Sequence, residues 1–482
     1  MYNHRSMKKL LTIIAATVCA CTAWAASEAD GIYYETEAGE AYVVGGEKKY
    51  SGEVIIPATV NIGGEKFQVK GIEKGAFKDS PDLIMVHLPS SITMIKDDFD
   101  DCPSLRFIIC DAAKPPFTTG FADCSATLYV PKSSYGRYRS SPMWRCFSDV
   151  YNKEEMPTEI DGVYYQIETA AGKGNKYASV TYVSEKKGKL NIPQKVKIDG
   201  KTYVVKTIQD DAFERYNGSE IKIAKTVSHI GEMAFIGCCA NLKSITVEEG
   251  NTKYASDNGA LYDRHKTVLL TVPQAKEGVF NMPATVTVIE DRAFEGCAKI
   301  TTINIPAKVE EINDVFTGCS SLTAINVDLE NTEYDSGNGI LFNKDRTELI
   351  RVPQTVSGEF SVPKYVSTIG YCAFEECKNI TRIIIPRSVT DIDKWAFKNC
   401  TGLTAIEIPS SVKEIGDEIL GDCTGLKYIR CRAARPPIID ADLTYDLDIP
   451  LYVPKMSLKK YKEGEFWMNF RNIRPSKELP KE

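Results

Sequence analysis

The sequence repeats itself with a period of about 23 residues, and this periodicity limits the possible folds more than any other feature. The pattern V-x-x-I returns at 23-residue steps from Val366 to Val389 and Val412, and again from Val286 to Val309. A unit this short cannot bury its own apolar face, so neighbouring units must stack and share one core. The periodicity therefore predicts a solenoid.

The same order of apolar residues recurs in each of nine units. V-x-x-I is followed, after about three residues, by A-F-x-x-C-x-x-L-x-x-I-x-I-P. In the unit from Val389, Ile406 and Ile408 alternate with Glu407, which is typical of a strand with one buried face. The A-F-x-x-C segment is too short for a regular helix and predicts a single turn.

Most cysteines belong to this repeat. One repeat position is taken by Cys102, Cys297, Cys319, Cys377, Cys400 and Cys423, and the unit from Val227 offers Cys238 or Cys239 there. Equivalent side chains in a solenoid point the same way from adjacent coils, so we expect small buried hydrophobes rather than disulfides.

Two further cysteines, Cys124 and Cys146, lie outside the ladder. An oxidising compartment could join them, which makes them a candidate disulfide. Cys110 is an alternative partner, and two free thiols are the remaining possibility.

Two repeats are oversized and carry matching inserts, each with an Asn-Gly pair, Asn258-Gly259 and Asn338-Gly339. Asn-Gly favours tight hairpin turns, so the inserts predict β-hairpins on the rim of the solenoid. Their aromatic residues are candidate stacking platforms for sugar rings: Tyr254, Tyr262, Tyr334 and Phe342.

The chain is also duplicated on a larger scale. Residues 26–151 form a short module with two repeats, residues 161–482 a long one with seven, and residues 152–160 a linker. Each module begins with a predicted β cap and ends with an aromatic cap. The aromatic residues of the two C-terminal caps fall at the same offsets: Tyr138, Trp144 and Phe147 against Tyr461, Trp467 and Phe470.

The repeat V-x-x-I-x-x-x-A-F-x-x-C-x-x-L-x-x-I-x-I-P resembles the BspA-like (Treponema pallidum-type) leucine-rich repeat. The Leu-Tyr-Val-Pro caps and the Asn-Gly inserts resemble those of the same family in surface proteins of Bacteroidota. The resemblance implies a β-rich leucine-rich-repeat solenoid with short turns and little regular helix. It also implies a place at the cell surface and adhesion to host matrix proteins, and it carries no catalytic residue.

The N-terminus predicts export. Lys8 and Lys9 precede an apolar run from residue 10 to 21, and Ala23-Trp24-Ala25 provides a cleavage site, so we interpret residues 1–25 as a signal peptide. The run is too short to span a membrane comfortably. Val18-Cys19-Ala20-Cys21 is a weaker lipobox, so membrane attachment would require lipidation. We expect a periplasmic, surface-bound or secreted protein.

Composition argues against several classes of function. The formal charge of −6 becomes about −9 once Arg5, Lys8 and Lys9 leave with the signal peptide, which disfavours nucleic-acid binding. The chain has only four histidines, and none stands beside a second ligand or base at useful spacing. We therefore predict no enzyme activity, no cofactor and no metal site.

A binding surface is the remaining candidate. Residues that flank the first inward isoleucine of each repeat strand point outward, and those in the middle of the array are small and polar. The C-terminal end gathers Arg382, Glu407, Tyr428 and Arg430. Tyrosine and arginine are common in binding hot spots, although a solvated sheet face is the alternative. We predict interaction with an extracellular or cell-surface protein, or, alternatively, glycan binding or a scaffolding role.

Overall fold

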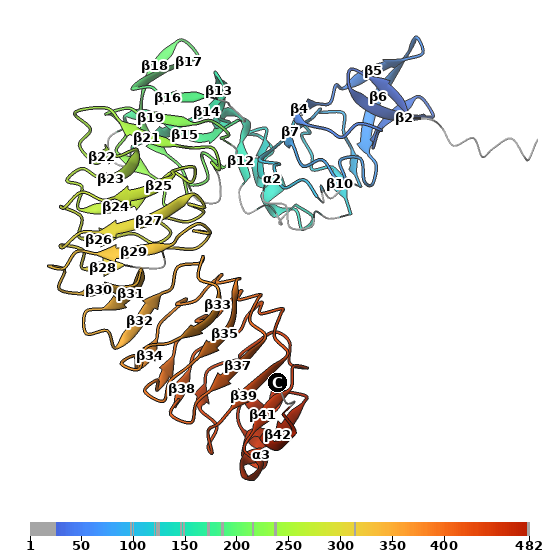
Figure 1. Cartoon of the computed structure of the whole chain (residues 1–482). Helices are drawn as coiled ribbons and strands as arrows, with labels where there is room; N and C mark the ends of the chain where they lie inside the picture. Colours follow the sequence, from blue (N-terminus) through green and yellow to red (C-terminus); the bar gives the residue numbers. More distant parts are fainter. Residues whose placement is uncertain are drawn as a thin grey trace, which may run out of the picture. The chain divides into compact units, whose positions relative to one another are not determined.

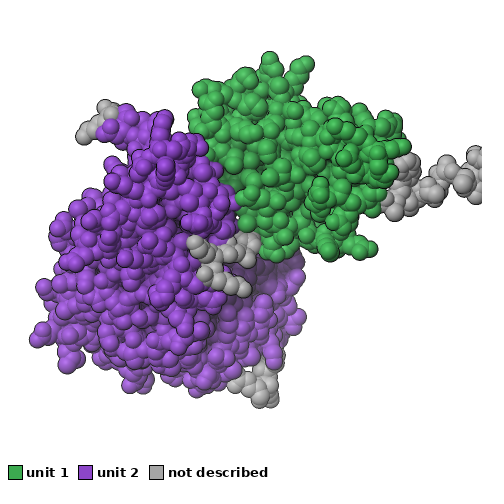
Figure 2. Space-filling model, turned by 90° about the horizontal axis from the view of Figure 1, so that it is seen from above, with its two compact units in different colours: residues 1–156 green, residues 157–482 purple. Residues whose placement is uncertain are grey.

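The computed structural model describes residues 26–96, 99, 101–119, 121, 126–144, 147, 150–170, 174–184, 188–214, 216–235, 239–312 and 315–479. The chain divides into two compact units, residues 1–156 and 157–482, which Figure 2 colours separately. Their boundary falls within the predicted linker. Asn152 still belongs to strand β12 of unit 1 and residues 158–160 form strand β13 of unit 2, so the connection is shorter than 152–160.

The described residues of unit 1 form two sheets and one short α-helix, α2 (Tyr135–Ser140). The first sheet has the order β1-β2-β3-β6-β8-β10 with β5 beside β6: β1 Ser27–Ala29, β2 Ile32–Glu37, β3 Glu40–Val44, β5 Thr59–Ile62, β6 Glu65–Ile72, β8 Met94–Ile95 and β10 Phe117–Thr118. The second has the order β12-β11-β9-β7-β4: β4 Gly52–Ile55, β7 Leu83–Leu88, β9 Phe107–Cys110, β11 Thr127–Val130 and β12 Val150–Asn152.

Unit 2 begins with a cap sheet and continues as stacked coils, which follow one another in chain order in Figure 1. The cap sheet comprises β13 Thr158–Ile160, β14 Val163–Thr169, β15 Lys176–Val183, β18 Lys201–Ile208, β17 Lys195–Ile198 and β20 His229–Ile230. The other face of each coil contributes one longer strand, in three parallel sheets: β16 Lys189–Ile192, β19 Glu220–Ile223 and β21 Ser244–Val247; β25 Gly278–Asn281, β27 Ile300–Ile305 and β29 Ala324–Val327; β33 Gly358–Ser361, β35 Ile380–Ile384, β37 Ala405–Ile408, β39 Tyr428–Cys431, β41 Leu451–Val453 and β42 Ile473–Pro475.

The V-x-x-I segments form a second set of short parallel strands, preceded at two places by the inserts. One sheet contains β22 Tyr254–Asp257, β23 Ala260–Asp263, β24 Val268–Thr271, β26 Val288–Ile289 and β28 Glu311–Ile312. The next contains β30 Tyr334–Gly337, β31 Ile340–Asn343, β32 Glu348–Arg351, β34 Thr368–Ile369, β36 Asp391–Ile392, β38 Glu414–Ile415 and β40 Ile438–Ile439. Helix α3 (Leu458–Glu463) lies in the C-terminal cap. The predicted β-rich solenoid with little helix is confirmed.

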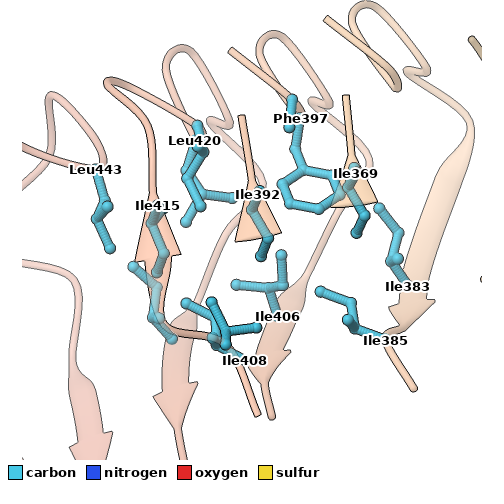
Figure 3. Close-up of a cluster of buried hydrophobic side chains, with 14 of the residues drawn as sticks. Ile369, Ile383, Ile385, Ile392, Phe397, Ile406, Ile408, Ile415, Leu420 and Leu443 are labelled. Carbon is cyan, nitrogen blue, oxygen red and sulfur yellow. The ribbon is translucent and has the colours of Figure 1, made fainter. Parts of the chain in front are cut away.

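The core of each coil is closed by three kinds of apolar residue, which Figure 3 shows pointing into a shared interior. Short strands contribute one isoleucine per coil, such as Ile392, and long strands contribute Ile406 and Ile408. The turn contributes Phe397, which is fully buried and lies 5.3 Å, centroid to centroid, from Phe374 of the preceding coil. Stacking therefore completes a core that no single repeat could form.

The described ladder cysteines of unit 2 are buried within this core, as predicted, whereas Cys102 of unit 1 is half-buried. The thiol of Cys400 donates a 3.1 Å hydrogen bond to the carbonyl of Phe374, and Cys423 does the same to Phe397 one coil later. Cys239 takes the ladder position in its unit, donating to the carbonyl of Phe213 at 3.4 Å. Each thiol thus satisfies a buried carbonyl of the preceding turn.

Left-handed backbone at two fixed positions forms the turns of several coils. The residue before the alanine of A-F has positive φ in Trp395 (60°) and Cys372 (53°), and the residue before the cysteine has positive φ in Asn399 (59°) and Glu376 (61°). Few of these positions hold glycine, although β-carbon sterics disfavour this conformation for other residues. Hydrogen bonds to the next coil hold the turn, such as that from the Phe397 amide to Ile419.

Both inserts form the predicted β-hairpins, but their tips lie against the sheet rather than out on the rim. The amide of Ile245 in β21 donates to the carbonyl of Gly259 at 2.8 Å, and that of Ile325 in β29 to Gly339 at 2.9 Å. A β-carbon on Gly339 would lie 2.9 Å from the α-carbon of Ala324, so the close approach requires glycine. The parallel sheet is interrupted beside each hairpin, and we call the junctions β21/β25 and β29/β33 the first and second seam.

Matching aromatic residues close the two modules at their C-terminal ends. The indole of Trp144 donates to the carbonyl of Pro116 at 3.0 Å, and that of Trp467 to Pro437 at 2.9 Å. The predicted correspondence of the two caps therefore extends to their hydrogen bonds. Within the described part of the chain, no helix is long and apolar enough to cross a membrane.

Candidate binding surfaces

The four residues predicted to bind a partner lie on three neighbouring strands of one parallel sheet. Arg382 is on β35, Glu407 on β37, and Tyr428 and Arg430 on β39. The register aligns Arg382 with Ala405 and Tyr428 in one row, and Glu407 with Arg430 in the next. We call the outward side of the sheet β33-β35-β37-β39-β41-β42 the strand face.

Ion pairs already engage the charges of the strand face. Arg430 Nη1 lies 3.0 Å from Glu407 Oε2, and Arg432 Nε lies 2.5 Å from the other carboxylate oxygen. Arg382 Nη1 lies 3.5 Å from Glu359 Oε2 on β33. The pairs are partly exposed, so each contributes little stability, but together they hold the arginine side chains in fixed positions.

Aromatic residues extend the strand face into the C-terminal cap. The rings of Tyr428 and Tyr452 meet edge to face with their centroids 5.8 Å apart. Tyr452 also lies opposite Arg430 and Arg474 in the register of β39, β41 and β42. Tyr452 is itself only 3% exposed, so it supports the ring of Tyr428 rather than offering surface to a partner. Sequence analysis missed Tyr452 and Arg474 because it assigned their strands to the cap.

The middle of the array carries a ladder of asparagines in place of charges. Asn281, Asn304 and Asn326 occupy one row of β25, β27 and β29. The side-chain amides of Asn304 and Asn326 each donate to the asparagine of the preceding strand, at 2.6 Å to Asn281 and at 2.9 Å to Asn304. This small polar surface matches its prediction and presents no anchor for a partner.

The insert aromatics do not form the predicted sugar-stacking platform. Tyr262 and Phe342 are fully buried. They lie on the second hairpin strand, where alternation sends them into the core of the following coils while Leu261 and Leu341 enter the preceding core. Tyr254 is half-buried, and its hydroxyl accepts a hydrogen bond from the amide of Ile230 at 2.9 Å.

Exposed aromatic residues occur instead on the turns of the C-terminal coils. Tyr371 is 42% exposed and its ring centroid lies 5.6 Å from that of Trp395. The Trp395 indole and the Tyr445 hydroxyl both donate to Glu418 Oε2, at 3.1 and 2.7 Å. We call Tyr371, Trp395 and Tyr445 the aromatic ridge. The repeat pattern does not reveal it, since these residues occupy variable positions.

The acidic and cysteine residues have structural partners rather than features of a reactive site. Burial opposes ionisation of Asp263, but hydrogen bonds from the amides of Val268, His265 and Thr267 lower its pKa, so the carboxylate closes the β23–β24 turn. Burial raises the pKa of Cys423 to about 12. Among the described residues, no cluster of histidine, cysteine and carboxylate side chains could hold a metal ion.

The predicted pair Cys124 and Cys146 lies outside the described residues, so the disulfide stays a prediction. Its alternative partner, Cys110, is a buried free thiol whose sulfur lies 3.1 Å from the hydroxyl of Tyr138. Burial raises the pKa of Cys110 to about 11. The signal peptide predicted over residues 1–25 also lies outside the described part of the chain.

Comparisons with known proteins agree on the repeat. The BspA type leucine-rich repeat region family matches residues 59–126, 192–269, 278–358 and 356–435, in six copies. A comparison with curated proteins finds no match. The chain is 20% identical to a leucine-rich cell surface protein from Faecalibacterium prausnitzii A2-165 of solved structure, covering 84% of this chain and 94% of that chain with a TM-score of 0.32.

A leucine-rich repeat protein from Bacteroides ovatus is 18% identical, covering 93% of this chain and 99% of that chain with a TM-score of 0.25. The pneumococcal vaccine antigen PcpA is 14% identical, covering 94% and 97% with a TM-score of 0.26. Because the matched repeats account for more than half of the sequence, this protein belongs to the family of BspA type leucine-rich repeat proteins.

Proposed function

We propose that this chain is an exported protein that binds other macromolecules at the cell surface and performs no catalysis. The strand face is the observation that carries the proposal. It offers arginine and tyrosine side chains, held by the pairs Arg430–Glu407 and Tyr428–Tyr452, over several adjoining strands. Such an extended and pre-ordered surface suits a protein partner better than a small metabolite.

The family and the N-terminus both support the proposed cellular location. BspA type repeat proteins are typically surface or exported proteins. The basic residues Lys8 and Lys9 before an apolar segment support export of this chain. Family members also support adhesion as the role, with host matrix proteins among the candidate partners.

The first experiment compares the mature chain with two variants by biolayer interferometry on immobilised extracellular matrix proteins. Tyr428→Ala with Arg430→Ala should weaken binding by about 1–3 kcal/mol, roughly 5- to 150-fold in Kd, because it removes the aromatic and cationic anchors together. Thr302→Ala with Asn304→Ala on β27 is the matched control and should leave binding unchanged. Equal binding by both variants would refute the assignment of the strand face.

Glycan binding is the second candidate, and the aromatic ridge favours it. Trp395 and Tyr371 place adjacent rings beside the carboxylate of Glu418, an arrangement that can stack on a sugar and accept its hydroxyl hydrogens. The ammonium groups of Lys394 and Lys398 lie over the Trp395 ring, so a sugar that stacks on this ring must displace them. A glycan array tests this role directly. The ridge would be the binding site if the chain binds a glycan but no protein, if Trp395→Ala abolishes glycan binding, and if Tyr428→Ala with Arg430→Ala leaves it unchanged.

A further inference from the structure

The two seams correspond along most of their length, and one of the positions at which they differ is that of the buried Arg351. Positions 80 apart match, so Gln274 corresponds to Gln354, as the shared Val-Pro before each glutamine confirms. By the same offset, Thr271 at the end of β24 corresponds to Arg351 at the end of β32. The first seam therefore has a small hydroxyl side chain where the second seam has a guanidinium.

Arg351 joins the coils on either side of the second seam. The residue is only 3% exposed. Its Nη1 donates to the carbonyl of Cys372 at 2.8 Å, its Nη2 donates to the carbonyl of Phe316 at 3.2 Å, and Glu375 Oε2 lies 3.6 Å from Nη1. The planar guanidinium of Arg351 thus interacts with backbone and carboxylate oxygens from adjoining coils at this seam.

At the first seam, a cleft opens beside Thr271. It has a volume of about 560 Å³, and Met233, Phe235 and Leu270 line it together with Thr271. A water-sized void of about 10 Å³ shares Phe235 and Thr271 with the cleft and is lined further by Glu295, the counterpart of Glu375. Thr271 is too short to join the coils here as Arg351 does at the second seam. The guanidinium of Arg292 instead contacts the cleft wall, with its Nη1 3.8 Å from the sulfur of Met233.

The charge around the cleft favours a cationic occupant. Glu232, Glu290 and Asp291 also line it. Among the described lining residues, Arg292 is the one basic residue. Its Nε lies 3.7 Å from Glu295 Oε2, so the charges of that pair compensate one another. An arginine combines an apolar stem, which can lie along Met233 and Leu270, with a cationic head.

We propose that the first-seam cleft binds an arginine side chain presented by a partner protein. The stem lies on the apolar wall and the guanidinium turns towards Thr271, where Arg351 turns at the second seam. Arginine is favoured over lysine because its planar fork can reach acceptors on two coils at once. The site lies beside the short-strand sheet β22–β28 and is separate from the strand face, so it can bind a second part of a partner.

The test uses the full mature chain with ¹³C-labelled methionine methyl groups and N-acetyl-L-arginine amide as the probe. The Met233 signal should shift and saturate with a millimolar Kd, as expected for one side chain. Met456, which is 91% exposed in the C-terminal cap, serves as the reference and should not shift. N-acetyl-L-citrulline amide, which lacks the charge, should bind at least about tenfold more weakly.

Variants then connect the signal to the cleft. Thr271→Arg supplies an internal guanidinium and should abolish the Met233 shift, whereas Thr246→Arg, at an exposed position of β21, should leave it unchanged. Glu232→Gln with Glu290→Gln should weaken binding about tenfold, and this variant decides the question if Thr271→Arg does not fold. No saturable shift, equal shifts with citrulline amide, or full binding by Thr271→Arg would overturn the proposal.

Discussion

The solenoid core makes Phe397→Ala the most informative perturbation of stability. The ring is fully buried and stacks 5.3 Å from Phe374, while the backbone of Phe397 accepts the thiol of Cys423 and donates to Ile419. The substitution removes the ring but keeps the backbone bonds. We expect a loss of about 3–5 kcal/mol, because the rigid turn cannot collapse into the space left behind.

The shift in melting temperature depends on how many coils unfold together. If all of unit 2 (157–482) unfolds as one, an unfolding entropy of about 0.7 kcal/mol/K converts this loss into a decrease of about 4–7 °C. Because coupling in a solenoid runs between neighbours, we expect the coils around β36 and β37 to open first. Calorimetry gives the first quantity, and hydrogen exchange of peptides across residues 380–431 gives the second.

Ile384→Ala is the matched control, since it truncates a residue of the preceding coil that is 40% exposed on the outward side. It should change stability by no more than about 0.5 kcal/mol. The reasoning fails if Phe397→Ala melts within 1–2 °C of the unaltered chain, or if exchange accelerates equally in all coils of unit 2.

Three further outcomes follow from the same contacts. Arg351→Met should destabilise unit 2 by about 3–5 kcal/mol in chemical denaturation, because the Glu375 carboxylate loses its buried partner. Adding Glu375→Gln should recover part of this loss. If the destabilisations of the two single variants instead add up in the double variant, the two residues are not a coupled pair. Iodoacetamide at pH 8 should label Cys423 only after unfolding, since burial raises the pKa of this thiol to about 12. Mass spectrometry follows the labelling, and rapid modification of Cys423 in the native protein would contradict its burial. Burial and the charge of Asp393 raise the pKa of Glu348 above 4.5, so the native state holds this proton more tightly than the unfolded chain, and stability must fall as the pH rises from 4.5 through the raised value. Glu348→Gln should therefore flatten the pH dependence of denaturation and stabilise the chain at pH 7, and an unchanged profile would exclude this role.

The sequence alone determined the repeat, and with it the fold. A residue such as Phe397 or Cys400 returns in most coils because each coil presents a similar environment to its neighbours. The residues that are buried in each coil can therefore be identified from the sequence alone. The hairpins at Asn258-Gly259 and Asn338-Gly339 were equally predictable, since only local backbone geometry is involved.

Tertiary structure decided whatever depends on contacts between coils. The alternation that predicts a strand at Tyr262 does not show that a second core lies on the other side of this strand, so the sequence alone favours a surface position for this buried tyrosine. The left-handed turns at Trp395 and Asn399 carry no glycine signal, because hydrogen bonds from the next coil stabilise them.

The candidate sites divide in the same way. Strand alternation placed Arg382, Glu407, Tyr428 and Arg430 on one face, but the ion pairs within it depend on which rotamers meet across strands. At the first seam, Thr271 stands where the second seam has the guanidinium of Arg351, and a cleft opens beside it. The sequence alone does not reveal the role of Arg351, because the carbonyl groups that accept its hydrogen bonds come from coils that are distant in the sequence.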